Sequence, residues 1–369
     1  MKLHRIQIHS FRNIVYAELI PCERFNIIVG NNAQGKTNIL ESVFLLGTMK
    51  SFRMVKNADL ITYGSPYAII KGWGQRDGVV REIALSISNS GKKAFVDQKP
   101  VVRPTDFFGT INTVVFSPED IAMVRGVPEM RRRYLDRAIF SGDTGYLSVH
   151  HEYFRILKQR NALLKQGEAD GLPIWSERLA DAGARLMEKR ESFIGEISRF
   201  FTEYYCSIAG PGHKAKLRYC SRITETDRTR ESLCNALYAA LEKSAHEELR
   251  RGTTLIGPHR DDLECILNDK PLNHHGSQGE QRSFILALKM AEIEYLRNRW
   301  GNPPILLLDD MTSELDRNRN GNLMDFLKEK DMQVFITTTS LDNINLVGIS
   351  NYSTFPVQEG RVLSEVTNV

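Results

Sequence analysis

The sequence predicts an α/β protein in which a helical segment is inserted into a sheet-rich body. Segments that read as strands, separated by Gly, Asn and Pro, dominate the first third of the chain. Apolar residues at helical spacing dominate residues 126–252, and alternating strands and helices return afterwards. A length of 369 residues fits two domains, or one large domain that carries an insertion.

The composition is that of an ordinary globular protein. Apolar residues make up 41% and charged residues 25% of the chain, which argues against a disordered, fibrous or membrane-spanning protein. The longest apolar runs are too short to cross a bilayer and the N-terminus has no apolar signal core, so we expect a cytoplasmic protein without a membrane partner. The five cysteines form no CxxC pair, which predicts buried free thiols in a reducing compartment.

Residues 1–125 are predicted to form a sheet-rich lobe. A single long helix interrupts the strands, because the apolar residues from Ile39 to Leu46 recur at helical spacing after Thr37. The strands are expected within 2–11, 15–20, 24–30, 67–74, 81–88, 92–101 and 111–120.

Residues 126–252 are predicted to form a helical arm. Two long helices are expected at 146–166 and 179–204, with turn-forming residues at 167–173 between them. A third helix ends at Gly252, a residue type that commonly caps the C-terminus of a helix.

The first two arm helices are predicted to pack as an antiparallel hairpin. The first carries an apolar stripe at Phe154, Leu157 and Leu164. The second carries a matching stripe that is interrupted only at Arg190.

Residues 253–369 are predicted to complete the sheet-rich body. Strands and helices alternate in this part of the chain, as in an α/β domain. The strands are expected at 264–268, 303–310 and 333–339, and the helices after Ser277 and over 319–330.

A phosphate-binding loop is predicted at residues 30–37, where GNNAQGKT satisfies the pattern G-x-x-x-x-G-K-[ST] between a strand and a helix. Gly30 and Gly35 let the backbone wrap around phosphates, Lys36 neutralises their oxygens, and the Thr37 hydroxyl binds Mg²⁺. A nucleotide is therefore the predicted ligand. The residues expected to bind it are Gly30, Asn31, Asn32, Ala33, Gln34, Gly35, Lys36, Thr37 and Asn38.

The segment PPILLLDD at 303–310 predicts the metal-binding end of the same site. A buried apolar strand that ends in two carboxylates suits a parallel strand whose tip meets Mg²⁺. Asp309 is expected to hold the metal. Asp310 is the candidate catalytic residue, because it would orient or deprotonate the attacking water.

The segment SQGEQ at 277–281 is predicted to begin a helix. Ser277 and Glu280 have the spacing of a capping box, and the dipole of the helix would present an anion site at its N-terminus. Gly279 would let a phosphate approach the backbone. Taken alone, this pattern is more often an ordinary helix cap.

The order of these motifs resembles the ATP-binding-cassette class. That resemblance implies a head of two lobes, a mixed or antiparallel β lobe and a P-loop α/β core, with ATP and Mg²⁺ as ligands. It also implies that Ser277, Gln278, Gly279, Glu280 and Gln281 contact ATP held by a second subunit, and that Ser313, Glu314 and Asp316 form the D-loop.

Within this class the chain resembles the RecF family of SMC-like proteins over almost its whole length. The similarity lies in FRNI (11–14), GNNAQGKTN (30–38), FSPED (116–120), RRRYLD (131–136), LIGPHRDDL (255–263), SQGEQR (277–282) and LLLDDMTSELD (306–316).

Membership of this family would imply a cytoplasmic bacterial protein of recombinational repair and replication-fork maintenance, active in the SOS response. Such a protein dimerises on binding ATP, binds DNA at gaps or single-strand to duplex junctions, and is a weak DNA-dependent ATPase. With RecR and RecO it helps to load RecA.

The chain departs from transporter-type cassettes at two positions. They have glutamate where this chain has the shorter Asp310, and they have a histidine where it has only threonines, at 337–339. Slow hydrolysis is expected from both differences. No clear glutamine is found for the usual metal contact in the middle of the lobe, and whether Glu119 or Asp120 replaces it is open.

By resemblance, Arg12 and Asn13 contact the base or sugar of the nucleotide, although an ordinary turn with a solvated arginine is equally consistent with the sequence. The net charge of +4 permits DNA binding without requiring it. The DNA-binding candidates are Lys50, Arg53, Lys56, Arg131, Arg132 and Arg133, and for the last three a structural role is equally consistent. The GPHRDD segment at 257–262 has no evident role.

Three other functions carry some of the same motifs. A transporter ATPase subunit is disfavoured by the missing histidine and the FRNI start. A non-enzymatic scaffold that ATP closes into a dimer remains open. A P-loop kinase is disfavoured, because nothing resembles a lid over an acceptor substrate and SQGEQ would have no role.

Overall fold

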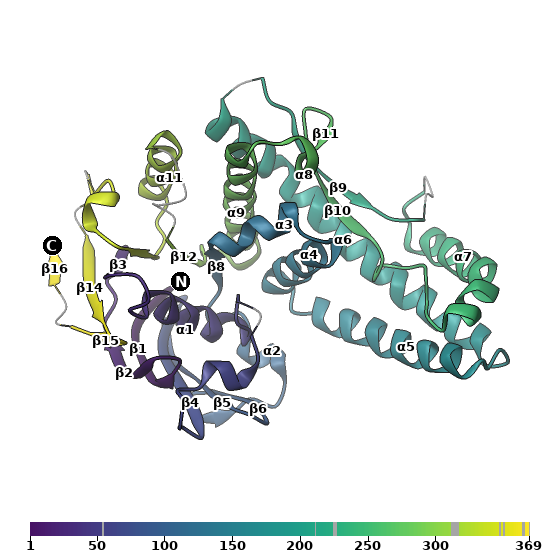
Figure 1. Ribbon diagram of the computed structural model, residues 1–369, viewed down its shortest axis with the longest axis horizontal. Helices are drawn as coiled ribbons and strands as arrows, with labels where there is room; N and C mark the ends of the chain where they lie inside the picture. Colours follow the sequence, from purple (N-terminus) through teal and green to yellow (C-terminus); the bar gives the residue numbers. More distant parts are fainter. Residues whose placement is uncertain are drawn as a thin grey trace. The chain divides into compact units, whose positions relative to one another are not determined.

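The structure is a computed structural model of the chain. It describes every residue except 54, 211, 224–226, 311–316, 347, 350, 364, 365 and 369, and for 104, 105, 317, 318 and 366–368 it describes the backbone alone. Backbone contacts divide the chain into two units (Figure 1). The head unit comprises Met1–Ile121, Tyr204–Pro211 and Gln278–Val369, and the arm unit comprises Ala122–Glu203 and Gly212–Ser277.

The head unit contains an antiparallel sheet with the strand order β2-β1-β4-β5-β6-β7. Strands β1 and β2 are joined by a two-residue turn, Arg12–Asn13, with Phe11 opposite Ile14. Residues that alternate along the strands put one face of the sheet on the core. The strands are β1 (Lys2–Phe11), β2 (Ile14–Leu19), β4 (Tyr67–Arg76), β5 (Val79–Ser88), β6 (Gly91–Val96) and β7 (Lys99–Pro100).

The second sheet of the head unit is mainly parallel, with the order β15-β14-β3-β13-β12-β8 and β16 paired to β14. Its central strands are continuous apolar runs, as expected for strands covered on both faces. The sequence predicted β3, β8, β12 and β13 but not the three strands after them. The strands are β3 (Phe25–Val29), β8 (Thr113–Phe116), β12 (Ile305–Leu308), β13 (Val334–Thr338), β14 (Tyr352–Gln358), β15 (Arg361–Val362) and β16 (Val366–Asn368).

Helix α1 (Lys36–Thr48) lies between the two sheets of the head unit. It contacts β1, β4 and β5 of the antiparallel sheet and β8 and β13 of the parallel sheet. Its side chains from Ile39 to Thr48 are all buried, which is why the helix is apolar on nearly every side. One hydrophobic core therefore joins both sheets, and the loop that precedes α1 starts from a rigid base.

Helix α9 (Gln278–Trp300) packs against β8 in the head unit, with residues 283–296 buried without a break. Shorter helices complete this unit: η1 (Asn57–Leu60), α2 (Pro104–Phe107), η2 (Pro118–Asp120), α11 (Arg317–Glu329) and η3 (Leu341–Asn343). Among the helices of the described residues of both units, none is long and apolar enough to cross a membrane.

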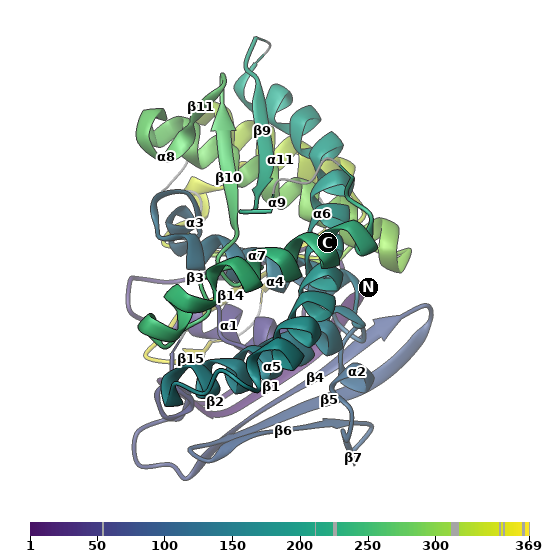
Figure 2. The same cartoon turned by 90° about the vertical axis from the view of Figure 1, so that its right-hand side faces the viewer.

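The arm unit combines helices with a small sheet of order β11-β10-β9. Strand β10 pairs antiparallel with β9, from Asp262 opposite Cys220 to Leu267 opposite Ala215, and Figure 2 shows the two strands side by side. The sequence analysis missed β9 and placed β10 with the head, whereas this pairing holds β10 in the arm unit. The elements are α3 (Ile121–Arg125), α4 (Pro128–Gly142), α5 (Tyr146–Gln166), α6 (Leu172–Ala209), β9 (Ala215–Cys220), α7 (Arg230–Arg251), β10 (Asp262–Leu267), β11 (Lys270–Pro271) and α8 (Leu272–His275).

Helices α5 and α6 form the predicted antiparallel hairpin. Glu152 forms an ion pair with Arg185 at 2.9 Å, and Arg160 Nε donates to Ser176 Oγ at 3.1 Å, so contacts advance along α5 as they recede along α6. The prediction that Phe154 lies in the packing stripe is wrong. The Phe154 side chain is exposed, whereas the side chain of the neighbouring Tyr153 is fully buried and faces the interior.

Arg190, which interrupts the apolar stripe of α6, is fully buried in the arm unit. It pairs with Asp136 at 2.8 Å and donates to the carbonyl of Pro258 at 2.7 Å. Burial alone would raise the pKa of Asp136, but Arg190, His150 and Tyr146 together hold it well below its usual range. Arg190 therefore interrupts the apolar stripe with a buried charge that is compensated by an ion pair and by hydrogen bonds.

The GPHRDD segment forms part of the same buried network. His259 Nε2 lies 3.2 Å from the Thr254 carbonyl, which can only accept, so Nδ1 accepts from the Tyr153 hydroxyl at 2.6 Å. Gly257 has φ of 129°, and a Cβ there would lie 2.6 Å from the same hydroxyl. Burial of the ring lowers the pKa of His259 to about 4.

The two acidic residues of GPHRDD also face the interior of the arm unit. Asp261 accepts from the Tyr219 hydroxyl at 2.6 Å, and Asp262 accepts both Nε and an Nη of Arg131, at 2.7 and 2.8 Å. The segment thus connects α4, α5 and α6 to the start of β10. Its role, which the sequence left open, is structural.

We expect His259 to make the arm unit less stable in acid. Its pKa is about 4 in the folded chain and 6.5 for the ordinary side chain, so the unfolded chain binds more protons between these values. Stability should therefore fall as the pH decreases from 6.5 to 4, by up to about 2 kcal/mol after allowance for solvent screening. Thermal unfolding of the wild type and of His259→Gln at pH 7 and pH 4.5 measures this.

The variant should lose less stability than the wild type over this pH range. His246→Gln, which replaces an exposed histidine of α7, is the control and should follow the wild type. Equal pH dependence of the wild type and His259→Gln would contradict the assignment.

Candidate nucleotide-binding site

The carboxyl ends of four parallel strands meet at one edge of the head sheet. Val29 of β3 lies opposite Thr338 of β13, and Leu308 of β12 lies opposite Phe116 of β8. The Gly30 amide donates to the Thr338 carbonyl at 3.2 Å, which continues this ladder past the end of β3. The predicted phosphate loop and both predicted carboxylates therefore follow strands that end side by side.

The predicted phosphate loop has the backbone of an anion-binding turn. Gly35 precedes α1 with φ of 109°, and Ala33 has φ of 64°. Lys36 is 7% exposed, and its Nζ donates to the loop carbonyls of Gly30 and Asn31 at 2.6 and 2.9 Å. Burial lowers the pKa of Lys36, and the nearby Asp310 and Asp309 oppose that shift. The loop and the start of α1 therefore provide a bound anion with backbone N–H donors and with one positive charge, that of Lys36.

The C-terminal strands, which the sequence analysis missed, hold the loop in place. A Cβ on Gly30 would lie 2.3 Å from the Val357 carbonyl oxygen of β14, so this glycine is required by strand packing as well as by the loop. Gln34 accepts from the Gly360 amide at 2.9 Å through its carbonyl and from the Glu359 amide at 2.7 Å through its side chain. No sequence motif indicated these two contacts.

Asp309 is the buried acceptor at the centre of the site. One carboxylate oxygen accepts from the Thr37 hydroxyl at 2.8 Å and from the Thr337 hydroxyl at 2.9 Å. Burial raises the pKa of Asp309, although both hydroxyls and the charge of Arg53 oppose that shift. A buried carboxylate beside a hydroxyl is an oxygen donor set that fits Mg²⁺, which would supply the missing positive charge.

Asp310 follows in a left-handed backbone conformation, with φ of 51°. Its amide donates to the Thr337 hydroxyl at 2.9 Å, so Thr337 bridges Asp309 and the backbone of Asp310. Thr337 belongs to the threonine run that stands where transporter cassettes carry a histidine. In this chain one member of the run, Thr337, bonds the Asp309 carboxylate and the backbone of Asp310.

Arg12 lies beside the loop but is not a solvated turn residue. Its guanidinium forms two hydrogen bonds to the fully buried Glu41 of α1, at 2.9 and 3.0 Å. The Asn13 side chain accepts from the side-chain amide of Asn38 at 2.7 Å and donates to the backbone carbonyl of Gln34 at 3.4 Å. The FRNI turn thus supports the first turns of α1 and the loop.

Arg53 is close to the same helix, although the sequence analysis grouped it with the DNA-binding candidates. It donates to the Asn38 side chain at 3.0 Å and lies 4.0 Å from Glu41. The positive charge of Arg53 also lowers the pKa of Asp309, so Arg53 contributes to the electrostatic potential at the candidate site. Lys50 and Lys56 are exposed.

The three consecutive arginines of the arm unit differ in their surroundings. Arg131 is buried and paired to Asp262 through two hydrogen bonds, which favours the structural role that the sequence left open for it. Arg132 donates to the Asp261 carbonyl at 2.8 Å and is half-buried. Arg133 is exposed and forms an ion pair with Glu129 at 2.5 Å.

Helix α9 begins at Gln278, directly after the exposed Ser277. A Cβ on Gly279 would lie 3.1 Å from two nitrogens of the Arg319 guanidinium, whose Nε donates to Ser283 Oγ at 2.7 Å. Gly279 therefore also makes room for an arginine of α11, which the sequence did not indicate. Gln281 is buried. The predicted D-loop residues Ser313, Glu314 and Asp316 lie outside the described residues.

The two acidic residues of FSPED have different surroundings. Asp120 accepts from the Ser117 amide at 2.8 Å and pairs with Lys289 of α9 at 3.1 Å. Glu119 is exposed, and its charge raises the pKa of Asp309. Of the two residues left open by the sequence, Glu119 is therefore the one whose charge contributes to the pKa shift of Asp309, the predicted metal-binding carboxylate.

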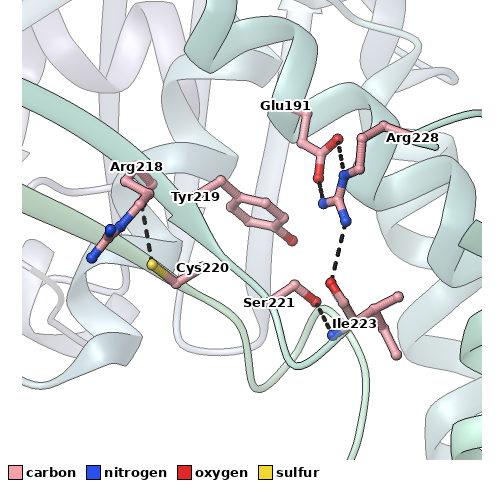
Figure 3. Close-up of a pocket in the computed structure, with 7 residues that line it drawn as sticks. All are labelled: Glu191, Arg218, Tyr219, Cys220, Ser221, Ile223 and Arg228. Carbon is pink, nitrogen blue, oxygen red and sulfur yellow. Dashed lines mark hydrogen bonds and ion pairs between the residues drawn. The ribbon is translucent and has the colours of Figure 1, made fainter. Parts of the chain in front are cut away.

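A pocket of about 480 Å³ in the arm unit lacks comparable chemistry (Figure 3). Arg228 points at Glu191 and pairs with it, and Arg218 pairs with Glu264 at 2.5 Å. Burial raises the pKa of the Cys220 thiol to about 11, so it is not a nucleophile at neutral pH. The lining residues are Glu191, Arg218, Tyr219, Cys220, Ser221, Ile223 and Arg228.

All five cysteines are free thiols, as predicted. Cys265 is buried, whereas Cys22, Cys206, Cys220 and Cys234 are partly exposed, so the expectation of burial holds for one of the five.

Comparison with known proteins agrees with this geometry. Residues 2–361 match the RecF/RecN/SMC N-terminal domain family. The DNA replication and repair protein RecF of Geotalea uraniireducens (strain Rf4) is 55% identical over 363 residues, covering 98% of this chain and 100% of the relative. The chain belongs to the RecF family. RecF of Geobacter metallireducens (strain ATCC 53774 / DSM 7210 / GS-15) is 56% identical over 362 residues, covering 98% and 99% of the two chains.

Solved structures of RecF share the whole fold. The recombination mediator protein RecF of the RecFOR pathway, solved as RecF-ATP, has a TM-score of 0.91 and 32% identity, covering 99% of this chain and 97% of that one. An Smc head domain from Pyrococcus furiosus has a TM-score of 0.56 and 17% identity, covering 99% and 96%. The second likeness shows the fold alone, and together they confirm the predicted SMC-like ABC-ATPase head.

We expect Thr337→Val to destabilise the head unit by about 1–3 kcal/mol. The substitution keeps the shape of the side chain but removes the hydroxyl that accepts from the Asp310 amide and donates to the buried Asp309. Thermal unfolding measures the loss. Thr337→Ser keeps the hydroxyl and should stay close to the wild type, and equal stability of the Val and Ser variants would contradict the bridging role.

Proposed function

We propose that the edge of the parallel sheet binds ATP with Mg²⁺. The observation that carries this proposal is a contact between two strand ends. Lys36 and Thr37 follow β3, and Asp309 follows β12. The Thr37 hydroxyl donates to Asp309, and the charge of Asp309 acts on Lys36. Thr37 and Asp309 would hold Mg²⁺, which neutralises phosphate charge when bound. The relative solved as RecF-ATP supports the choice of nucleotide.

The residues of the loop have defined tasks in this proposal. Lys36 exchanges its two backbone acceptors, the carbonyls of Gly30 and Asn31, for phosphate oxygens. The amides from Asn31 to Thr37 would face the phosphates at the start of α1, where the helix dipole favours an anion. Asn13 and Arg12 support the loop and α1 from the β1–β2 turn.

Asp310 is proposed as the residue that orients or deprotonates the attacking water. Its side chain is one methylene shorter than glutamate, and Thr337 holds its backbone in place. A short base is less well placed to reach a water, so hydrolysis is proposed to be slow. Its dependence on DNA is proposed from the family resemblance. ATP binding would then be the long-lived signal and hydrolysis the reset.

The start of α9 is proposed to bind the ATP of a second copy of this chain. Ser277 is exposed at the N-terminus of a long buried helix, where the helix dipole favours an anion, and a dimer would bring the ATP phosphates of the second copy to this helix end. Gln278, Gly279, Glu280 and Gln281 accompany it. Ser313, Glu314 and Asp316 keep their predicted place as the D-loop.

The ATP-bound dimer is proposed to act on DNA in recombinational repair. Relatives named DNA replication and repair protein RecF, and a recombination mediator of the RecFOR pathway, support this assignment. The proposed partners are gapped or junction DNA, RecR and RecO, with RecA loading as the outcome in the cytoplasm. Lys50, Lys56, Arg132 and Arg133 stay as DNA-contact candidates, whereas Arg53 and Arg131 have the other partners described above.

The first test of dimerisation is the light-scattering mass with Mg²⁺, with and without ATP. The mass should double with ATP, and Ser277→Arg should weaken dimerisation by at least about tenfold because a bulky cation fills the proposed phosphate contact. Ser90→Arg, at an exposed turn of the head unit, is the control and should dimerise normally. Dimerisation of Ser277→Arg at the wild-type level would contradict the proposal.

The test of hydrolysis is phosphate release by Asp310→Asn with and without DNA. Asparagine tolerates the left-handed backbone of Asp310, so the variant should fold and bind ATP. Loss of the base should slow hydrolysis by about 10²–10⁴-fold. Unchanged hydrolysis would show that Asp310 is not the base, and repair activity retained without hydrolysis would favour the scaffold alternative.

A further inference from the structure

Helix α9 carries a buried lysine far from its N-terminus. Lys289 lies in the interior of the head unit with 2% of its surface exposed, on a helix that is buried through residues 283–296. Burying an ammonium group is costly unless it is paired and well placed. The position of this charge therefore constrains α9 more than an apolar residue would.

The partner of Lys289 lies outside α9. Its Nζ is 3.1 Å from Asp120 of η2 and 3.8 Å from Glu292 of its own helix. The other carboxylate oxygen of Asp120 accepts from the Ser117 amide at 2.8 Å, which caps η2 at the end of β8. One ion pair thus ties the middle of α9 to the segment that follows β8.

The same segment is tied to the metal-binding carboxylate. The Asp309 amide donates to the Phe116 carbonyl at 2.9 Å, one residue before Ser117. A continuous path of short contacts therefore runs from Asp309 through Ser117 and Asp120 to Lys289.

We propose that Lys289 is a positioning residue that couples the nucleotide site to the placement of α9. This inference rests on the proposed function, because it concerns how ATP in one copy prepares that copy to bind the ATP of another. Phosphate and metal beside Asp309 would act on the segment from Phe116 to Asp120 through the hydrogen bond from the Asp309 amide to the Phe116 carbonyl. Asp120 carries that response to Lys289, and a rigid helix transfers it to Gln278.

A purely structural ion pair is the alternative, and the two can be separated. Replacing a buried pair by apolar residues of similar volume is often neutral for stability, whereas breaking it by one substitution is costly. The variant pair Lys289→Met with Asp120→Leu should therefore recover stability relative to Lys289→Met alone. If the pair positions α9, dimerisation should stay impaired in the double variant.

The experiment measures three properties of the full chain with Mg²⁺. They are the thermal stability, the affinity for a fluorescent ATP analogue, and the ATP-dependent dimerisation constant from light scattering. Lys289→Met, the double variant and Arg160→Met are compared with the wild type. Arg160 forms a fully buried ion pair with Glu248 at 2.7 Å in the arm unit, so it controls for breaking such a pair elsewhere.

We expect both Lys289 variants to bind the analogue within about threefold of the wild type and to dimerise at least about tenfold more weakly, with Arg160→Met dimerising normally. Recovery of both stability and dimerisation in the double variant would overturn the proposal. So would an equal loss of dimerisation in Arg160→Met.

Hydrogen exchange at the start of α9 tests the coupling independently of the proposed dimerisation. If the wild type binds ATP but stays monomeric, the proposed dimerisation fails. The coupling is then supported by an ATP-induced change in exchange around Gln278 that Lys289→Met abolishes. The same change in both proteins, or in neither, would overturn it.

Discussion

The head unit depends on placing one carboxylate, Asp309, where water cannot solvate it. Its burial at the end of β12 obliges the fold to supply donors, and they come from both neighbouring segments: Thr37 at the start of α1 and Thr337 at the end of β13. Those two hydroxyls fix how the loop, the strand tips and α1 sit together. The same unmet charge creates the demand for a cation, so stability and ligand binding have one origin.

Buried charges organise the arm unit as well. Arg190, Arg160 and Arg131 are each removed from water and each has a carboxylate partner from another element. Such pairs add little net stability. A displaced helix would leave a buried charge without its ion-pair partner, so the pairs favour the observed arrangement of helices over similar alternatives. In the head unit Lys289 has this character, and there the pair reaches a segment beside the candidate site.

The parts of the fold that follow a local rule were predictable from the sequence. The α5 boundaries match the prediction because period and cap are local. The predicted phosphate loop and Asp309 could be singled out because phosphate chemistry requires fixed residue types at fixed spacing, and in the structure the two meet. Contacts that depend on distant strands were not predictable. Nothing near β10 shows that it pairs with β9, and nothing near Gly30 shows that Val357 presses on it. The two roles left open for Arg131 could not be separated from the sequence for the related reason that a basic run does not reveal which of its members is buried.

The two strands that flank β3 affect how this protein can be made. Strand β3 emerges early in synthesis, yet its neighbours β13 and β14 lie at residues 334–338 and 352–358, and the turn that holds Gln34 lies at Glu359 and Gly360. On the ribosome the first strands must wait for almost the entire chain before the loop has its native supports. The arm unit, whose elements lie within 122–277, can fold before that. A nascent chain therefore cannot assemble the complete candidate nucleotide site until translation is nearly finished.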